Sequence, residues 1–188
     1  MNKTLKLLLS LFIGLTFTGC TSNDSSTEVK GTTTTCVVYF SAQGHTEVIA
    51  KYIQEIENCD IYEIEPSDAY TDEDLDYNSD CRANSEQEDS TARPEIKNKF
   101  DFSQYEVIYI GYPIWWTDVP KIIMTLLDTY DLSGKELIPF CTSGGSDIDK
   151  SVKTLKTNYP KLTFMVGKRF SQSTTKEDVE SFINEYKD

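Results

Sequence analysis

Residues 36–46 read CVVYFSAQGHT, an apolar run that opens into a short polar loop. Residues 47–56 carry apolar side chains at helical spacing, so the segment predicts a strand, a loop and a helix in that order. Ser41, Gly44 and Thr46 give the loop two hydroxyls and a glycine that permits close approach. At a helix start such a loop also offers backbone N–H groups, which is the chemistry of a phosphate site. Ordinary turns and helix caps use the same residues, so the loop alone leaves both interpretations open.

A second apolar run, residues 107–111, opens into a loop that reads YPIWW at 112–116 and holds both tryptophans of the chain. An indole binds a large flat ring system well, because it brings much apolar area at small entropic cost. Neighbouring side chains of an extended segment point to opposite sides. We therefore expect one of Trp115 and Trp116 to pack in the core and the other to contact a ring-shaped ligand.

A third apolar run, residues 136–141, leads into TSGGSD at 142–147 and then into a helical stretch from Asp149. Small or aromatic loops thus follow three strands of one predicted sheet. In open parallel sheets, ligands bind at the carboxyl ends of the strands, near the point where the strand order reverses. The three loops are therefore expected to meet at a single site.

From about Cys36 to Tyr186 the chain resembles the flavodoxins. More narrowly, it is similar to a subgroup with GYPIWW after the third strand, here residues 111–116, and PFCT-x-GGS after the fourth, here 139–146. The pair Arg93-Pro94 in the long preceding loop fits the same subgroup. The resemblance implies a flavodoxin-like α/β fold of three layers over residues 35–188, with a five-stranded parallel sheet in the order 2-1-3-4-5. It also implies flavin mononucleotide, FMN, as the cofactor.

The resemblance assigns the parts of FMN to the three loops. The phosphate would be held by Ser41, Gln43, Gly44, His45 and Thr46. One side of the isoalloxazine ring would be contacted by Pro113, Ile114, Trp115 and Trp116, and its other edge would be lined by Thr142, Ser143, Gly144 and Gly145.

The chain departs from the family pattern at four of these loop positions. Phosphate loops of the family often read Ser-x-Thr-Gly-Asn-Thr, whereas this chain has Gln43 and His45. The subgroup commonly carries a histidine at the position of Ser143 and a glycine at that of Asp147, so any function of that histidine is lost here. We expect Asp147 to cap the next helix in preference to contacting the flavin rim. For His45 we favour backbone binding at the helix start over a role as general acid or pH sensor.

Three functions stay open at this point, and none of them assigns a catalytic residue. The first is an electron carrier, in which the protein sets the potential of its flavin. The second is an oxidoreductase that takes hydride from NAD(P)H and reduces a quinone or a flavin. The sequence has no nicotinamide-binding Gly-x-Gly-x-x-Gly motif, which favours the carrier. The third is a lipid-anchored binding domain that has kept the fold and lost the flavin.

The net charge narrows the classes of partner, and the histidine and cysteine content bears on metal sites and disulfides. The formal net charge is −13, which argues against a nucleic acid partner and suits a basic redox partner protein. A metal site is not expected, because the chain has one histidine and scattered cysteines. A disulfide between Cys36 and Cys59 is permissible, but buried free thiols are favoured for Cys36 and Cys141, and Cys81 is expected to be exposed.

The first nineteen residues predict a bacterial lipoprotein signal. Two lysines precede a short apolar run at 7–17, and small residues lead to Cys20, the predicted lipidation site. Residues 20–34, rich in Ser and Thr, then form a flexible tether. The protein would be anchored by its lipid to a membrane of the bacterial cell envelope, outside the cytoplasm.

The remaining segments complete the predicted architecture. Residues 60–64 and 162–166 are expected to form the edge strand and the last strand, and 120–130 and 178–186 two amphipathic helices. The long acidic stretch 69–99 could cover a ligand, but we favour a solvated loop with one short helix.

Overall fold

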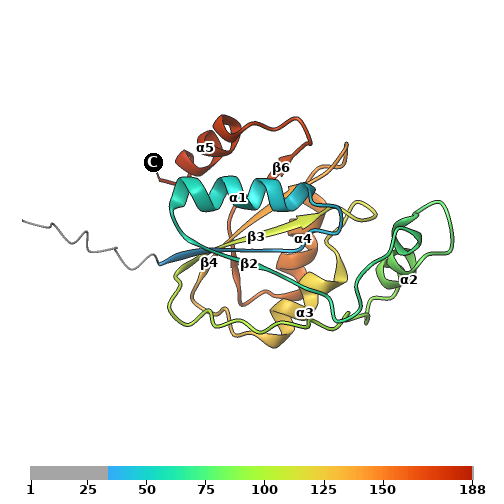
Figure 1. Cartoon of the computed structure of the whole chain (residues 1–188). Helices are drawn as coiled ribbons and strands as arrows, with labels where there is room; N and C mark the ends of the chain where they lie inside the picture. The colour runs from blue at the N-terminus through green and yellow to red at the C-terminus, as the bar shows by residue number, and fades with distance from the viewer. Residues whose placement is uncertain (1–33, 188) are drawn as a thin grey trace, which may run out of the picture. The chain divides into compact units, whose positions relative to one another are not determined.

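The computed structural model describes residues 34–187, and its central feature is a parallel sheet with helices on both faces (Figure 1). The strands are β1 (Thr35–Tyr39), β2 (Asp60–Glu63), β3 (Val107–Pro113), β4 (Glu136–Thr142), β5 (Thr163–Phe164) and β6 (Lys168–Phe170). Their order is β2-β1-β3-β4-β5, and every pairing is parallel. The predicted flavodoxin-like fold and strand order are therefore confirmed.

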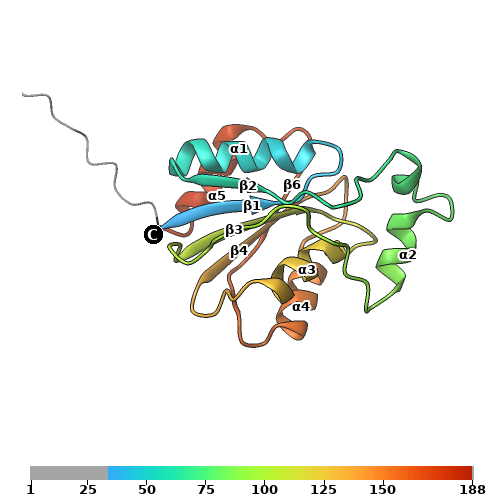
Figure 2. The same ribbon diagram turned by 60° about the horizontal axis from the view of Figure 1, so that its bottom comes forward.

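Four helices form the two outer layers. The helices α1 (His45–Glu57) and α5 (Lys176–Asn184) cover one face of the sheet, and α3 (Lys121–Thr129) and α4 (Asp149–Asn158) cover the other (Figures 1 and 2). The short 3-10 helix η1 (Glu73–Leu75) and helix α2 (Arg82–Glu88) belong to the long segment between β2 and β3. Helix α2 lies beyond the carboxyl ends of the strands, on the right in Figure 1.

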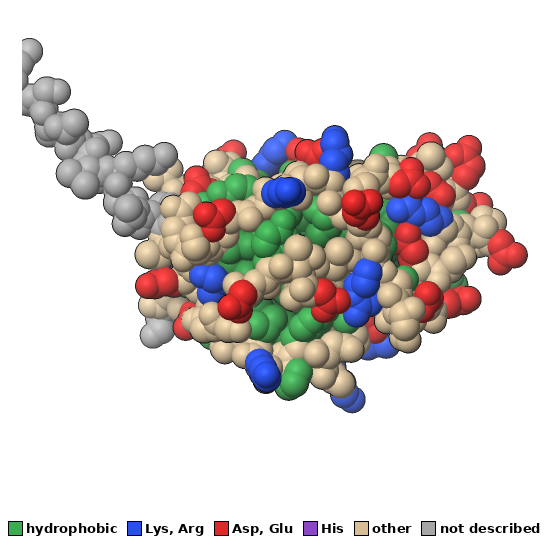
Figure 3. Space-filling view, turned by 90° about the horizontal axis from the view of Figure 1, so that it is seen from below, with side chains coloured by type: hydrophobic (Ala, Val, Ile, Leu, Met, Phe, Trp, Pro, Cys, Tyr) green, Lys and Arg blue, Asp and Glu red, His purple; other side chains and the backbone are tan. Residues whose placement is uncertain are grey.

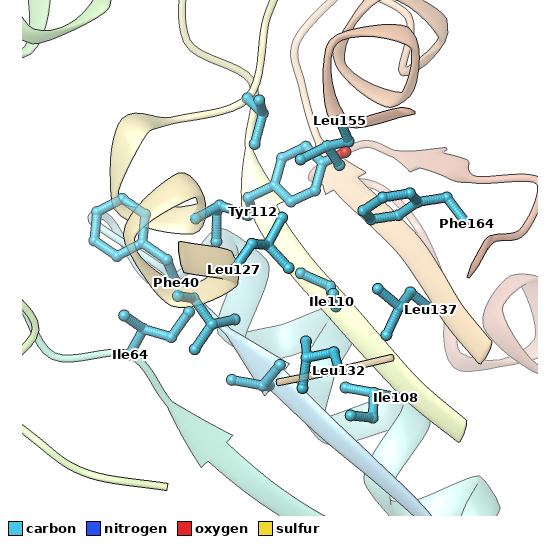
Figure 4. Packing of buried hydrophobic residues seen from close by; sticks show 14 of the residues in the cluster. Phe40, Ile64, Ile108, Ile110, Tyr112, Leu127, Leu132, Leu137, Leu155 and Phe164 are labelled. Carbon is cyan, nitrogen blue, oxygen red and sulfur yellow. The ribbon is translucent and has the colours of Figure 1, made fainter. Parts of the chain in front are cut away.

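The core follows from the alternation of side chains along buried strands. In β1, Val38 faces the layer of α3 and α4, whereas Val37 and Tyr39 face α1 and α5; all three are buried. A strand buried on both faces reads as an unbroken apolar run, which is how residues 36–40 appear in the sequence. The core beneath α3 and α4 includes Ile110 and Tyr112 (Figure 4). These layers hold the strand ends, and hence the loops after them, in fixed positions.

The last strand differs from the prediction of one strand over 162–166, because a bulge divides it into β5 and β6. Leu137 of β4 pairs with Phe164, and Phe140 of β4 pairs with Lys168. The chain between β5 and β6 therefore has one residue more than the facing part of β4, which defines a bulge. Pro139, inside this interval, has no N–H to donate, so an interrupted ladder costs less there.

Helix ends differ from their predicted limits by a few residues. The closing helix begins at Lys176 instead of residue 178, because Thr175 caps it: its hydroxyl accepts from the Asp178 N–H at 3.3 Å. The Asp178 carboxylate accepts from the Thr175 N–H at 2.9 Å, which completes a capping box. Helix α3 begins directly after Pro120, as expected of a proline at a helix start.

The four cysteines of the described residues are free thiols, and all four are buried. Cys36, Cys59 and Cys141 belong to the apolar core, and burial raises the pKa of Cys59 and of Cys141 to about 12. The prediction that Cys81 is exposed is wrong. Its sulfur accepts from the Asn84 N–H at 3.5 Å and caps the start of α2, so the thiol is turned inward.

The predicted signal peptide 1–19, the lipidation site Cys20 and the tether up to residue 33 lie outside the described residues. Within residues 34–187, no helix is both long enough and apolar enough to cross a membrane.

Candidate functional site

The loop between β1 and α1, residues 41–46, presents a row of backbone N–H groups. Gly44 has a φ of 83° and precedes α1, a conformation that glycine adopts without strain. The Ser41 hydroxyl accepts from the Glu47 N–H at 3.3 Å and so closes the loop onto the helix. Among residues 34–187, no protein group accepts from the N–H groups of 42–46. Free N–H groups at a helix start attract an anion.

Thr142, the last residue of β4, ties the three predicted loops together. Its hydroxyl bonds to the Thr46 hydroxyl at 2.8 Å, and both side chains are buried. Its carbonyl accepts from the Ile114 N–H at 2.9 Å. The convergence expected at the strand ends is therefore made by direct hydrogen bonds, with Thr142 as their common member.

The two tryptophans point to different surroundings, but the predicted core position of one of them is met only in part, because Trp115 packs against the core without being buried in it. Trp115 is half-buried and meets Phe40 edge-on, with ring centroids 5.5 Å apart, and Tyr70 at 5.1 Å. Trp116 is 55% exposed, and its indole N–H donates to the Asn84 side-chain oxygen at 2.8 Å.

The tryptophan loop, defined as residues 114–119, contains a tight turn that the sequence did not reveal. Trp115 and Asp118 exchange both backbone hydrogen bonds, at 3.0 and 2.9 Å. The residues between them, Trp116 and Thr117, have φ values of 50° and 61°. This is a type I′ turn, which usually takes Asn-Gly. A side chain in this left-handed region costs roughly 1–2 kcal/mol, so contacts elsewhere must stabilise the turn.

The loop after β4 is held from the side of β6. The Ser143 N–H donates to the Phe170 carbonyl at 3.0 Å, and Arg169 Nη1 donates to the Ser143 carbonyl at 3.2 Å. The Gly145 N–H donates to the Ser143 hydroxyl at 3.1 Å. Asp147 accepts from the Ile148 N–H at 2.7 Å, but Ile148 precedes α4 and no side chain caps that helix, so the expected capping by Asp147 is wrong.

The segment after β6 reaches the first loop through a residue that the sequence analysis missed. The side-chain nitrogen of Gln172 lies 2.9 Å from His45 Nε2. This contact joins the segment after β6 to the loop at 41–46.

The three loops enclose a cavity of about 470 Å³ at the carboxyl ends of β1, β3 and β4. Most of the predicted site residues line it, namely Ser41, Gln43, His45, Thr46, Pro113, Ile114, Trp115, Trp116, Thr142, Ser143 and Gly144. Gly44 and Gly145 shape the loops without lining the cavity. The residues that the prediction missed are Ala42, Leu75, Tyr77, Ala83, Asn84, Thr117, Ser146 and Gln172.

Part of the long segment 69–99, within residues 75–84, covers this cavity, whereas most of the segment is exposed as expected. Its predicted short helix is present as α2, but Ala83 and Asn84 of that helix line the cavity together with Leu75 and Tyr77. The apolar residues within an otherwise acidic stretch were the signal for a ligand-covering segment.

No Lys, Arg, Asp or Glu is among the residues that line the cavity. An anion bound there would be met by N–H groups and hydroxyls instead of by cations. The apolar wall and the indoles suit a flat ring, and the loop at 41–46 suits a phosphate. Cavities of this volume bind ligands the size of a mononucleotide cofactor.

Comparisons with known proteins agree on one family. The family model described as flavodoxin matches residues 34–186. A protein from Bacteroides uniformis described as a candidate flavoprotein is 40% identical, with a TM-score of 0.77 over 80% of this chain and 97% of that one. A second, from Bacteroides eggerthii, is 38% identical, with a TM-score of 0.76 over 80% and 95%.

A flavoprotein in complex with FMN from Lactobacillus acidophilus is 25% identical, with a TM-score of 0.66 over 82% of this chain and 98% of that one. A comparison with curated proteins found no match.

Proposed function

Since the chain belongs to the flavodoxin family, we propose that it binds FMN in the cavity described above and transfers electrons between partners. The observation that carries the proposal is the row of free N–H groups over residues 42–46 at the start of α1. Such a row matches the needs of a phosphate group. The similar flavoprotein from Lactobacillus acidophilus was crystallised with FMN, which supports this choice of ligand.

The residues of the cavity fit both ends of FMN. The N–H groups of 42–46 and the Ser41 hydroxyl would hold the phosphate, and the buried Thr46 hydroxyl keeps Thr142 in place beside them. When bound, FMN supplies one- and two-electron redox chemistry, and the protein contributes binding, orientation and electrostatics. The lining has no carboxylate, so none in direct contact with the ring system would oppose electron uptake.

The ring would lie between the tryptophan loop and the loop after β4. The N–H groups of Ile114, Ser143 and Gly145 already donate to protein acceptors. Among residues 34–187, the Gly144 N–H has no protein acceptor and lies in the lining, so it is the donor we assign to the polar edge of the ring. The free indole face of Trp116 would supply the apolar contact.

Electron exchange is proposed to occur with a basic partner protein. Residues 69–89, four of which line the cavity, hold eight Asp and Glu and a single Arg. Acidic side chains gather at the end of the molecule that carries α2, on the right in Figure 3. Such a surface steers a basic protein toward the cavity, and the association rate should fall as salt is added.

Lipid anchoring at Cys20 remains a proposal that rests on the sequence alone. Expression in a bacterium with labelled palmitate tests it directly. We expect label and membrane association in the parent and their loss in Cys20→Ala. Label in the variant, or none in the parent, would contradict the proposal.

A fluorescence titration of FMN with a chain that begins at Thr21 tests the central proposal. Quenching that saturates at one flavin per chain is the expected result. Anaerobic reduction with and without NAD(P)H then separates the carrier from the NAD(P)H-dependent oxidoreductase. Absence of quenching at high micromolar flavin would refute FMN binding and favour a binding domain without flavin.

A further inference from the structure

Two amide side chains of α2 hold the tryptophan loop from outside. The Asn84 oxygen accepts from the Trp116 indole N–H at 2.8 Å. Gln87 Nε2 donates to the carbonyls of Trp115 at 3.0 Å and of Val119 at 3.2 Å. The three bonds reach the turn at its tip and on both flanks, so α2 defines where the indole lies.

The orientation of the Asn84 amide is itself determined by its neighbours. Its nitrogen donates to the carbonyls of Ser79 at 2.7 Å and of Tyr77 at 3.3 Å. Turning the amide over would place its nitrogen against the indole N–H and its oxygen against two carbonyls. Only one orientation satisfies every donor and acceptor, so Asn84 presents a fixed acceptor to Trp116.

Helix α2 is attached to the domain mainly by polar contacts. It spans seven residues, of which Ala83 alone is buried. Glu86 accepts from the Tyr70 hydroxyl at 2.5 Å and from Arg82 Nε at 2.8 Å, and Tyr70 packs against Trp115. The helix and the tryptophan loop therefore support one another, and neither is held by the core alone.

We propose that Asn84 and Gln87 are positioning residues that hold the Trp116 indole at the open side of the cavity. The turn needs them, because Trp116 and Thr117 lie in a backbone region that favours glycine. The link to a ligand rests on the proposed function, since FMN is the molecule whose ring the indole would contact. The position of the indole can be measured without FMN.

The test compares Asn84→Ala with Asn98→Ala. Both substitutions are made in the full chain carrying Trp115→Phe, so that Trp116 is its only tryptophan. Asn98 is a matched control, because it is also half-buried in the long segment and also makes two backbone contacts. Its amide donates to the Glu63 carbonyl at 2.6 Å and accepts from the Glu65 N–H at 3.1 Å, and it does not line the cavity.

Loss of the indole acceptor should be seen in two measurements. Acrylamide should quench Trp116 about twofold more strongly in Asn84→Ala, and FMN should bind about five- to tenfold more weakly, since one hydrogen bond is lost. Asn98→Ala should change neither value by more than about twofold, whatever it costs in stability. Asn84→Asp keeps an oxygen acceptor but turns a second oxygen toward the carbonyls of Ser79 and Tyr77, so it should restore the shielding only in part.

Unchanged quenching in Asn84→Ala would overturn the proposal, whether or not FMN binds. Failure of the parent to bind FMN would refute the proposed function, and the quenching comparison would still decide the role of Asn84. If Asn84→Ala does not fold, Gln87→Ala provides the same comparison, because the Gln87 amide binds the tryptophan loop and not the carbonyls of residues 77 and 79.

Discussion

Replacement of Gly44 by alanine tests whether FMN binding needs the left-handed backbone of the loop at 41–46, apart from any effect on the stability of the fold. Gly44 has a φ of 83°, and a Cβ built there meets no atom within 4 Å. Steric crowding therefore adds nothing to the loss of stability. The loss is that of placing a side chain in the left-handed region, roughly 1–2 kcal/mol. For a chain of this size that corresponds to a fall in Tm of about 2–8 °C.

Gly134 provides the control for this experiment. It has a φ of 78° and also meets no atom within 4 Å of a built Cβ, but it lies in the turn before β4, away from the cavity. Thermal unfolding should show similar losses for Gly44→Ala and Gly134→Ala. In Gly44→Ala the backbone would relax from the left-handed region and turn the N–H groups of the loop away from the phosphate. Only that variant should therefore weaken FMN binding, by about tenfold.

Two results would refute the reasoning. If Gly44→Ala keeps the parental Tm, the left-handed conformation is not required there. If Gly134→Ala weakens FMN binding as much as Gly44→Ala, the effect on binding comes from general destabilisation and not from the N–H groups of the loop.

Three further predictions concern Thr142, the buried thiols and the partly desolvated Glu63. Thr142→Val removes the partner of the buried Thr46 hydroxyl. It should lower the free energy of unfolding, measured in urea, by about 1–3 kcal/mol, whereas an unchanged value would show that water replaces the partner. The four thiols of residues 34–187 should resist a thiol reagent until the chain unfolds, and fast reaction of one thiol in the native chain would contradict their burial. Partial desolvation at the edge of the sheet, with Glu47 and Glu65 nearby, raises the pKa of Glu63, so this group stabilises the fold below the ordinary carboxyl pKa and that contribution is lost as pH rises through the raised value. Glu63→Gln should therefore increase the free energy of unfolding at pH 7 and have no effect below about pH 4; equal effects at both pH values would rule out titration as the cause.

The architecture and most of the cavity could be predicted from short-range patterns. Unbroken apolar runs marked strands buried on both faces, and polar loops followed by helical spacing marked where each strand ends. Because carboxyl ends of parallel strands share one edge of a sheet, residues 41–46, 113–116 and 142–144 had to lie near one another. Each of these inferences needs only the local sequence and the geometry of a parallel sheet.

Other features depend on contacts between residues that are distant in sequence. Segment 69–99 looked solvated because its charges dominate its composition, yet Leu75 and Ala83 face the cavity. Cys81 looked exposed because its neighbours are polar, yet it caps α2 from inside.

The sequence by itself determined the fold family and the three loops that meet at the strand ends, because these depend on periodicity and local turn chemistry. Only the tertiary structure decided what covers the cavity, which hydroxyl pairs with Thr142, and how Gln172 meets His45. The physical reason is that a hydrogen bond between residues 127 positions apart leaves no mark on the spacing of side chains near either partner.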